Sequence, residues 1–218
     1  MPTTTKENYL KALYFLHQKD EAIALSDLGK SMQVSKPTVS DMVKKLQAKG
    51  WIKYEKYRPL KLTKQGIKVA ALIVRKHRLA EMFLAQIMGF GWEEVHDIAE
   101  EIEHVKSEKL FDRMDELMGF PAVDPHGSPI PDKDGNFNKP NYKLLSQIPE
   151  NSTVILKALR NSSTDFLLYL NKKELQLSTE ISVHQIESFD KSMTVSYGNF
   201  SEVILSNSVS NHLLVVEV

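Results

Sequence analysis

Histidines and glutamates between Arg75 and Val105 recur at spacings that would bring them together on helices. At about 100° per residue, His77 and Glu81 lie within roughly 40° of each other around a helix axis. Imidazole nitrogens and carboxylate oxygens are common ligands of divalent metals. A second set shares one face at the same period, and it comprises His96, Glu100, Glu103 and His104. The spacing therefore predicts two halves of a metal site.

A plainer interpretation of this segment stays open. Further acidic residues lie in it, and charge runs usually form a solvated surface; they are Glu93, Glu94, Asp97 and Glu101. Between the two halves, Gly89-Phe90-Gly91 is a helix stop that could fold the two faces together. The segment alone is therefore compatible with a metal centre or with an acidic surface helix.

The composition limits the chemistry of such a site. The chain has 218 residues and no cysteine, so a metal must be held by nitrogen and oxygen. This donor set favours manganese, ferrous iron, cobalt or zinc over copper(I). No apolar run approaches the roughly 20 residues that span a bilayer, and the N-terminus has no signal-type apolar core. We expect a cytoplasmic protein of two or three small domains with no membrane partner.

The neutral net charge conceals an asymmetry along the chain. Residues 1–70 carry 14 Lys and Arg against 6 Asp and Glu, a net charge of +8. Residues 71–120 carry 6 against 11, and residues 121–218 carry 8 against 11. Only the first third therefore has the charge expected of a protein surface that binds a polyanion.

The same third has the pattern of a helix-turn-helix followed by a β-wing. Apolar spacing predicts a helix over about 5–17, a short helix over 26–32, and a second helix that begins at Ser35 and ends before Gly50. Two alternating runs, 51–57 and 60–63, form the predicted wing. In this motif the start of the second helix contacts base edges, and basic side chains meet phosphates.

Candidate DNA contacts lie on that second helix and on the wing. Thr38 can offer its methyl group to thymine, whereas Asp41 would repel phosphate and could accept only from a donor such as cytosine N4. Asp41 is thus a candidate for specificity rather than affinity. A winged helix used for protein contacts is the alternative. The full set is Ser35, Lys36, Pro37, Thr38, Ser40, Asp41, Lys44 and Lys45 on the helix, with Lys53, Lys56 and Arg58 on the wing.

The remaining chain is divided by a proline-rich stretch. Helices are expected over about 63–88, 92–105 and 107–118, and together they could form a dimer interface. Residues 120–140 read as a linker or an ordered loop. Beyond them, short β-rich runs at 153–159, 181–186, 193–197, 203–205 and 213–216 favour a small barrel.

Taken in order, several stretches resemble the diphtheria-toxin-repressor family of metal-dependent transcription factors, especially its three-domain manganese-sensing branch. They are Ser35-Lys36-Pro37-Thr38-Val39-Ser40, Arg75-Lys76-His77-Arg78-Leu79-Ala80-Glu81, Val95-His96-Asp97, Glu103-His104-Val105, Gly119-Phe120-Pro121 and Asp124-Pro125-His126-Gly127-Ser128-Pro129-Ile130-Pro131. Together they cover essentially the whole chain.

The resemblance implies a fold, partners and a ligand set. The fold would be multidomain and mainly α: a winged helix over 1–72, a helical dimerisation and metal domain over 73–140, and an SH3-like barrel over 141–218. The implied protein is a homodimeric repressor that binds double-stranded operator DNA and controls metal-uptake genes, and metal binding would lock it in a DNA-competent state. His77, Glu81 and His96 match the family's ancillary site. Positions of its primary or paired-metal sites are matched by Glu100, Glu103 and His104, and in the manganese branch by Asp124 and His126. Family members differ in which histidine they use, so the resemblance leaves open whether His104 or His126 completes the primary site.

Two residues of the first helix depart from the family pattern. Members commonly carry aspartate or methionine where this chain has Asn8, and one manganese-sensing group has glutamate where it has Lys11. Asn8 can still offer a carbonyl oxygen, but Lys11 cannot be an ordinary ligand. Carboxylates at Glu100 and Asp124 stand where some relatives have cysteine. An oxygen-rich site favours Mn(II), with Fe(II) second and Zn(II), Co(II) or Cd(II) as surrogates.

Two rival functions remain at this stage. Glu101-Ile102-Glu103-His104 contains the Glu-x-x-His spacing of di-metal carboxylate oxidases, but no second copy of this motif occurs. The chain also lacks a nucleophile elbow and a glycine-rich phosphate loop, so we expect no enzyme. The non-enzymatic rival is a winged-helix regulator whose metal is purely structural.

Overall fold

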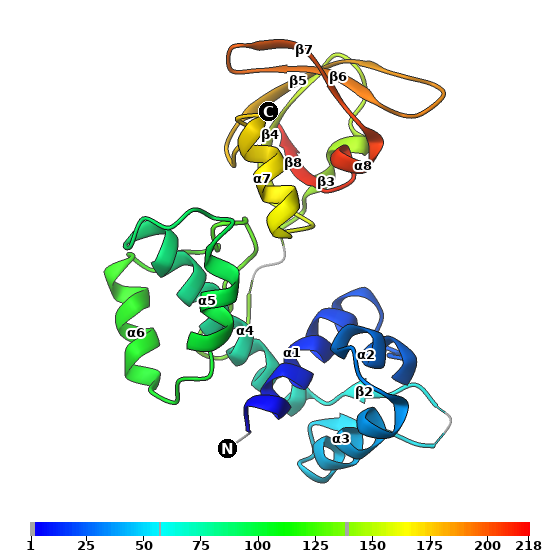
Figure 1. Ribbon diagram of the computed structural model, residues 1–218, viewed down its shortest axis with the longest axis vertical. Coiled ribbons are helices and arrows are strands. Elements are labelled where there is room, and N and C mark those ends of the chain that lie inside the picture. Colours follow the sequence, from blue (N-terminus) through cyan, green and yellow to red (C-terminus); the bar gives the residue numbers. More distant parts are fainter. Residues whose placement is uncertain (1–2, 57, 138–139) are drawn as a thin grey trace. The chain divides into compact units, whose positions relative to one another are not determined.

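A computed structural model describes residues 3–56, 58–137 and 140–218. Figure 1 shows the path of the chain. Its elements are α1 (Thr4–Lys19), α2 (Leu25–Met32), α3 (Lys36–Ala48), β1 (Ile52–Lys53), β2 (Lys61–Leu62), α4 (Lys64–Gln86), α5 (Val95–Ile102), α6 (Glu108–Leu117), β3 (Lys143–Leu144), the 3₁₀ helix η1 (Leu145–Gln147), β4 (Ser152–Leu159), α7 (Thr164–Lys172), β5 (Glu180–Ile186), β6 (Met193–Tyr197), β7 (Phe200–Leu205), α8 (Asn207–Ser210) and β8 (Leu213–Glu217).

The chain divides into two compact units. The first comprises Met1–Ala80, Ile98–Phe120 and Ile130–Phe137, and the second comprises Glu81–Asp97, Pro121–Pro129 and Asn138–Val218. Both α4 and α5 continue from one unit into the other. The three-domain division expected from the sequence has other boundaries, and it stays a prediction.

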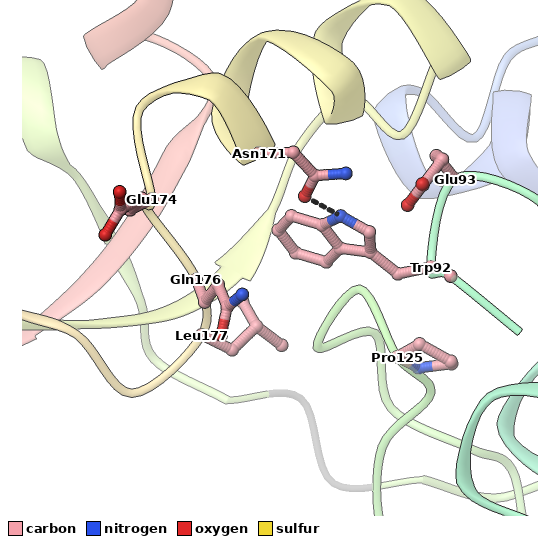
Figure 2. A pocket seen from close by; sticks show the side chains of 8 residues that line it. Trp92, Glu93, Pro125, Asn171, Glu174, Gln176 and Leu177 are labelled. Atoms are coloured by element: carbon pink, nitrogen blue, oxygen red, sulfur yellow. Dashed lines mark hydrogen bonds between the residues drawn. The ribbon is translucent and has the colours of Figure 1, made fainter. Parts of the chain in front are cut away.

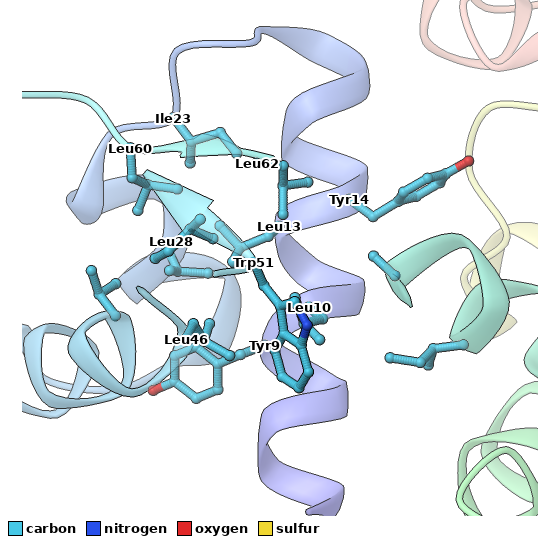
Figure 3. Close-up of a cluster of buried hydrophobic side chains, with 14 of the residues drawn as sticks. Tyr9, Leu10, Leu13, Tyr14, Ile23, Leu28, Leu46, Trp51, Leu60 and Leu62 are labelled. Atoms are coloured by element: carbon cyan, nitrogen blue, oxygen red, sulfur yellow. The ribbon is translucent and has the colours of Figure 1, made fainter. Parts of the chain in front are cut away.

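The first unit contains the expected winged helix. Apolar residues at spacings of three and four place one face of α1 in the core, including Leu10, Leu13 and Tyr14. This face packs with Leu28 of α2, Leu46 of α3 and Ile23 before α2, and with Trp51, Leu60 and Leu62 of the wing (Figure 3). The apolar spacing thus fixes which side of α3 is buried, and its polar side is left for contacts with a partner.

The wing is shorter than its sequence pattern suggested. Ile52 pairs with Leu62 and Lys53 with Lys61 in an antiparallel ladder of two-residue strands. Tyr57, part of the predicted first run, lies outside the described residues. An isolated bridge between Ile23 and Leu60 anchors the second arm.

The helices that follow the wing are confirmed, but one is shorter than expected. α4 matches the predicted 63–88 segment closely, and the buried ion pair between Arg75 Nη2 and Asp115 Oδ2, at 2.6 Å, ties it to α6. The expected helix over 92–105 is reduced to α5, Val95–Ile102. Glu103 and His104 therefore lie in the turn after the helix, and they do not continue its face.

The second unit contains the predicted C-terminal β domain. Its antiparallel sheet has the order β3-β8-β4-β5-β6-β7. In β6, buried and half-buried residues alternate, so Met193, Val195 and Tyr197 enter the core. The sequence interpretation did not foresee β3, α7 or α8. In the described part of the chain, none of the helices has both the length and the hydropathy that a membrane span needs.

Candidate metal centres and DNA reader

In the described part of the chain, each unit holds one group of metal-ligating side chains whose members all belong to that unit. The loop cluster consists of Glu81, Asp124 and His126 in the second unit. The helix cluster consists of His77, Glu100 and Glu103 in the first unit. Within each cluster, ligand atoms lie within 4.8 Å of one another.

Glu81 of the loop cluster comes from the C-terminal half of α4, and the other two members come from the proline-rich segment. All three side chains are buried. Two carboxylates buried this close together are costly unless positive charge or hydrogen bonds compensate them. The sequence left open whether residues 120–140 form a linker or an ordered loop, and residues 121–129 are an ordered loop that carries two of the three donors.

Backbone hydrogen bonds hold this loop in one conformation. Asp124 Oδ1 accepts from the amides of His126 and Ser128, both at 2.9 Å. An isolated bridge joins Val123 to Pro129. Gly127 has φ +83°, and a Cβ atom there would lie 2.2 Å from the carbonyl oxygen of Lys157. Only glycine therefore fits at position 127, where the loop passes close to the neighbouring strand β4.

The imidazole of His126 is oriented by Trp92. His126 Nε2 lies 2.8 Å from the carbonyl oxygen of Trp92, and because a carbonyl only accepts, this nitrogen carries the proton. The unprotonated Nδ1 atom then carries the lone pair of the ring. It lies 4.0 Å from Oε2 of Glu81. The indole of Trp92 stacks on the imidazole of His126. Its Nε1 donates to Asn171 Oδ1 of α7 at 2.7 Å (Figure 2). This hydrogen bond connects the loop cluster to the β domain within the second unit.

His96 lies at the edge of the loop cluster. Its Nδ1 is 3.2 Å from Glu81 Oε1, and its side chain is 48% exposed. It is thus close enough to Glu81 to join the cluster from the solvent side. The sequence grouping of His77, Glu81 and His96 as an ancillary site stays a prediction.

The carboxylates of the helix cluster are paired with a lysine side chain. His77 Nδ1 lies 2.7 Å from Glu103 Oε2 and 4.0 Å from Glu100 Oε1. The Nζ atom of Lys11 donates to the same Oε2 of Glu103 at 2.8 Å and also to Glu100. The cluster therefore joins α1 of the winged helix to the end of α5.

Burial raises the pKa of Glu103, but the hydrogen bond from His77 and the charge and hydrogen bond of Lys11 outweigh this effect. The net result is a pKa below the ordinary value of 4.5. The neighbouring nitrogens thus keep Glu103 ionised.

His104 lies beside Glu7 as well as Glu103. Its Nδ1 lies 2.5 Å from Oε2 of Glu7, and its Nε2 lies 3.7 Å from Oε1 of Glu103. Glu7 was missed by the sequence interpretation, although Glu7, Asn8 and Lys11 fall on one side of α1 at helical spacing. Asn8 Oδ1 is buried without a hydrogen-bond partner in the described residues. The interpretation of Glu101-Ile102-Glu103-His104 as an oxidase motif is not supported, because Glu101 is exposed and His104 follows the end of α5.

On the DNA reader, α3 presents its polar side to solvent. Val39, Val43 and Leu46 are buried, and most of the predicted contact residues are exposed, with Ser40 half-buried. Ser35 occupies the N-cap position, and its hydroxyl lies 2.9 Å from that of Thr38. The predicted specificity residue, Asp41, pairs with Lys45 at 2.5 Å. A contact from Asp41 to a base edge would therefore compete with this ion pair. The wing residues Lys53, Lys56 and Arg58 are exposed.

Comparison with known proteins agrees with this geometry. Residues 1–60 match the family model "Iron dependent repressor, N-terminal DNA binding domain". Residues 63–132 match "Iron dependent repressor, metal binding and dimerisation domain". A solved structure of ScaR with bound Zn²⁺ is 32% identical over all of both chains, with a TM-score of 0.80. The chain belongs to the iron-dependent repressor family.

Among solved family members, a manganese-dependent transcriptional repressor in complex with manganese is 29% identical to this chain. The match covers 98% of this chain and all of the other, with a TM-score of 0.87. Among curated iron-dependent repressors, IdeR of Mycobacterium leprae is 36% identical over 127 residues, 58% of this chain and 55% of its own. The diphtheria toxin repressor of Corynebacterium diphtheriae is 26% identical over 98% of this chain and 97% of its own.

The iron-dependent repressor family consists of metal-dependent transcriptional repressors, not enzymes. The matched family models assign DNA binding to the winged helix, and metal binding and dimerisation to the segment that contains the helix cluster, Glu81, Asp124 and His126. This agrees with the function class inferred from the resemblance. The alignment with IdeR covers only about half of that curated relative.

Proposed function

We propose that this chain is a metal-dependent transcriptional repressor that binds operator DNA as a homodimer and senses manganese(II), with iron(II) as the second choice. The observation that carries the proposal is the buried loop cluster in a chain that also presents a basic reader helix. Metal-uptake genes are the proposed targets, since a repressor activated by metal lowers further uptake. Its DNA target implies a cytoplasmic location.

The donors of the loop cluster fit a hard divalent ion. Two carboxylates and one imidazole, with His96 at the edge, form an oxygen-rich set without sulfur. Such a set suits manganese(II) and iron(II), and cobalt, zinc or cadmium can substitute for them. When bound, the ion supplies the positive charge that compensates Glu81 and Asp124. The solved relatives support this choice in part, because one is a complex with manganese and ScaR has been solved with Zn²⁺ and with Cd²⁺.

The protein's own residues prepare this site before an ion arrives. The amides of His126 and Ser128 fix one oxygen of Asp124, and the carbonyl of Trp92 fixes the tautomer of His126. Such outer contacts raise affinity because the ligands need little reorganisation. An ion that binds the DNA-competent state more tightly than the other state must, by linkage, tighten DNA binding.

The reader contributes affinity mainly through phosphate contacts. Lys36, Lys44 and Lys45 are exposed along α3, and the wing adds further basic side chains. A dimer would place two such helices in successive major grooves of an operator with two half-sites. Support for self-association comes from exposed apolar side chains on and after α6, including Leu110, Leu117 and Phe120.

The decisive experiment measures binding of the full chain to its own promoter DNA, for apo protein and with Mn(II), Fe(II) or Zn(II). We expect operator affinity to rise at least about tenfold with Mn(II), the range of an ordinary allosteric coupling. Equal affinity of apo and metal-loaded protein would sink the sensor function. A rise with Zn(II) but none with Mn(II) would reject manganese as the sensed ion.

The DNA interface is tested by Lys44→Ala, with Lys19→Ala as a control at the exposed end of α1. We expect Lys44→Ala to weaken binding to all sequences and to lower the slope of log K against log salt by about one. The control should leave both quantities unchanged. An unchanged slope for Lys44→Ala would remove this residue from the phosphate contacts.

A further inference from the structure

A positively charged side chain lies between the two carboxylates of the helix cluster. Nζ of Lys11 donates to Oε2 of Glu103 at 2.8 Å and also to Oε1 of Glu100. Lys11 is 8% exposed, and the carboxyl group of Glu103 is inaccessible to solvent. The ammonium therefore bridges two of the three cluster members inside the protein.

We propose that the Lys11 ammonium is the resident cation of the helix cluster and excludes a divalent ion from it, so that the sensed ion binds at the loop cluster. The exclusion of an ion by Lys11 is independent of the proposed function. The binding of the sensed ion at the loop cluster rests on that function. The consequence is a chain that binds one ion where the cluster geometry alone suggests two.

Distance and charge support this exclusion. A manganese-type ion lies about 2.0–2.6 Å from carboxylate oxygens. Lys11 Nζ already lies 2.8 Å from the Glu103 oxygen that also faces His77. An ion bound to that oxygen and to Glu100 would touch the ammonium, and two buried positive charges in contact repel strongly. The ion could enter only if Lys11 left or lost its proton.

Lys11 is also held in place by its helix. Its neighbours Leu10 and Leu13 are completely buried in the core of the winged helix. Moving the ammonium away would leave Glu103 buried beside Glu100 with its ammonium partner gone, which is costly. Lys11 thus joins α1 to the end of α5 whether or not metal is present.

Two acceptor atoms near the helix cluster favour the opposite view, that a divalent ion binds there. Asn8 Oδ1 and Glu103 Oε1 are buried and have no hydrogen-bond partner in the described residues. Together with His104 Nε2, which lies 3.7 Å from that Glu103 oxygen, they make three ligands, few for an ion that usually takes about six. Because the other oxygen of the same carboxylate is bonded to the ammonium, we expect these atoms not to hold a divalent ion.

The test counts Mn(II) bound per full-length chain by equilibrium dialysis, using wild type, Lys11→Glu, and each combined with Glu103→Gln. We expect one ion for wild type and one for Glu103→Gln, because the helix cluster is not used. We expect two for Lys11→Glu, since a carboxylate replaces the ammonium, and one again when Glu103→Gln is added. His126→Ala should reduce the wild-type count to zero.

Three results would decide against one or other part of the proposal. A wild-type count of two that falls to one in Glu103→Gln overturns the inference about Lys11. A folded Lys11→Glu chain that gains no ion overturns it as well. A wild-type count of zero with one ion in Lys11→Glu supports the role of Lys11 but rejects the metal site of the proposed function.

A second measurement does not depend on a variant that folds. Wild type with and without Mn(II) is treated with an amine-acylating reagent, and the modified lysines are located by mass spectrometry. Lys19, exposed on the same helix, is the internal control. We expect Lys11 to react about tenfold more slowly than Lys19 in both states, because it is buried and paired. An increase in its reactivity to the Lys19 level on addition of Mn(II) means that the ion displaces the ammonium, which overturns the inference.

Discussion

The loop cluster and the helix cluster use similar ligands but differ in how their negative charge is compensated. In the helix cluster a lysine from α1 donates to both glutamates. In the loop cluster two backbone amides bind Asp124, and a backbone carbonyl orients His126. In the helix cluster a tethered ammonium lies against the carboxylates, whereas in the loop cluster backbone groups hold Asp124 and His126 in place. The same residue types thus form a structural link in the helix cluster, and in the loop cluster we propose that they form the sensing site.

The largest effect that separates the two clusters is expected from His126→Ala. It removes a donor from the loop cluster, and we expect Mn(II) affinity to fall at least about 100-fold, the upper range seen when even outer contacts of a metal site are lost. Isothermal titration calorimetry measures the affinity. His184→Ala is the matched control, because His184 is exposed on β5 and bonds to Ser196. Equal losses in both variants would show that the effect is not specific to the cluster.

Lys11→Met should have the next largest effect, and it acts on stability. Removing one partner of a buried ion pair leaves the other charge uncompensated, so we expect a loss of about 3 kcal/mol in the free energy of unfolding of the apo protein. Urea denaturation measures it. The control Lys19→Met should change stability by less than about 0.5 kcal/mol. If Lys11→Met leaves the free energy of unfolding unchanged, the ammonium contributes no net stabilisation to the helix cluster.

The acid limb of stability gives a smaller and more specific test. Burial raises the pKa of Glu103, but the hydrogen bond from His77 and the charge of Lys11 lower it below 4.5 overall. Its ionised form therefore stabilises the fold fully above 4.5, and this contribution is lost as pH falls through the lower folded value. Urea midpoints between neutral pH and pH 3 should decrease less steeply for Glu103→Gln than for wild type. If the urea midpoints of wild type and Glu103→Gln fall equally with pH, the lowered pKa of Glu103 is contradicted.

The smallest effect is expected at the contact between Trp92, which orients His126, and α7. Trp92→Phe keeps an aromatic ring beside His126 but removes the N–H that donates to Asn171. We expect a loss of about 1 kcal/mol in stability. In a double-mutant cycle with Asn171→Ala, the two losses should not add, because both remove the same hydrogen bond. Additive losses would show that this bond contributes nothing.

Much of the winged helix could be predicted from local sequence. Apolar residues at helical spacing placed Leu10, Leu13 and Leu46 in the core, and this placement determined that the lysines of α3 face solvent. Such patterns work because burial depends on which side of a helix a residue occupies. The length of α5 was harder to predict: its ligand pattern runs on to His104, but the helix ends at Ile102.

The sequence by itself determined the donor inventory, the absence of thiolates, the basic first third and the reader helix, because each depends on residue type or short-range spacing. Only the tertiary structure decided which donors meet. Lys11 contacts Glu103 across 92 positions of the chain, and His126 is oriented by the carbonyl of Trp92, 34 positions away. The physical reason is that a metal cluster or an ion pair depends on distances of a few ångströms, and no local periodicity encodes distances between segments that only folding brings together.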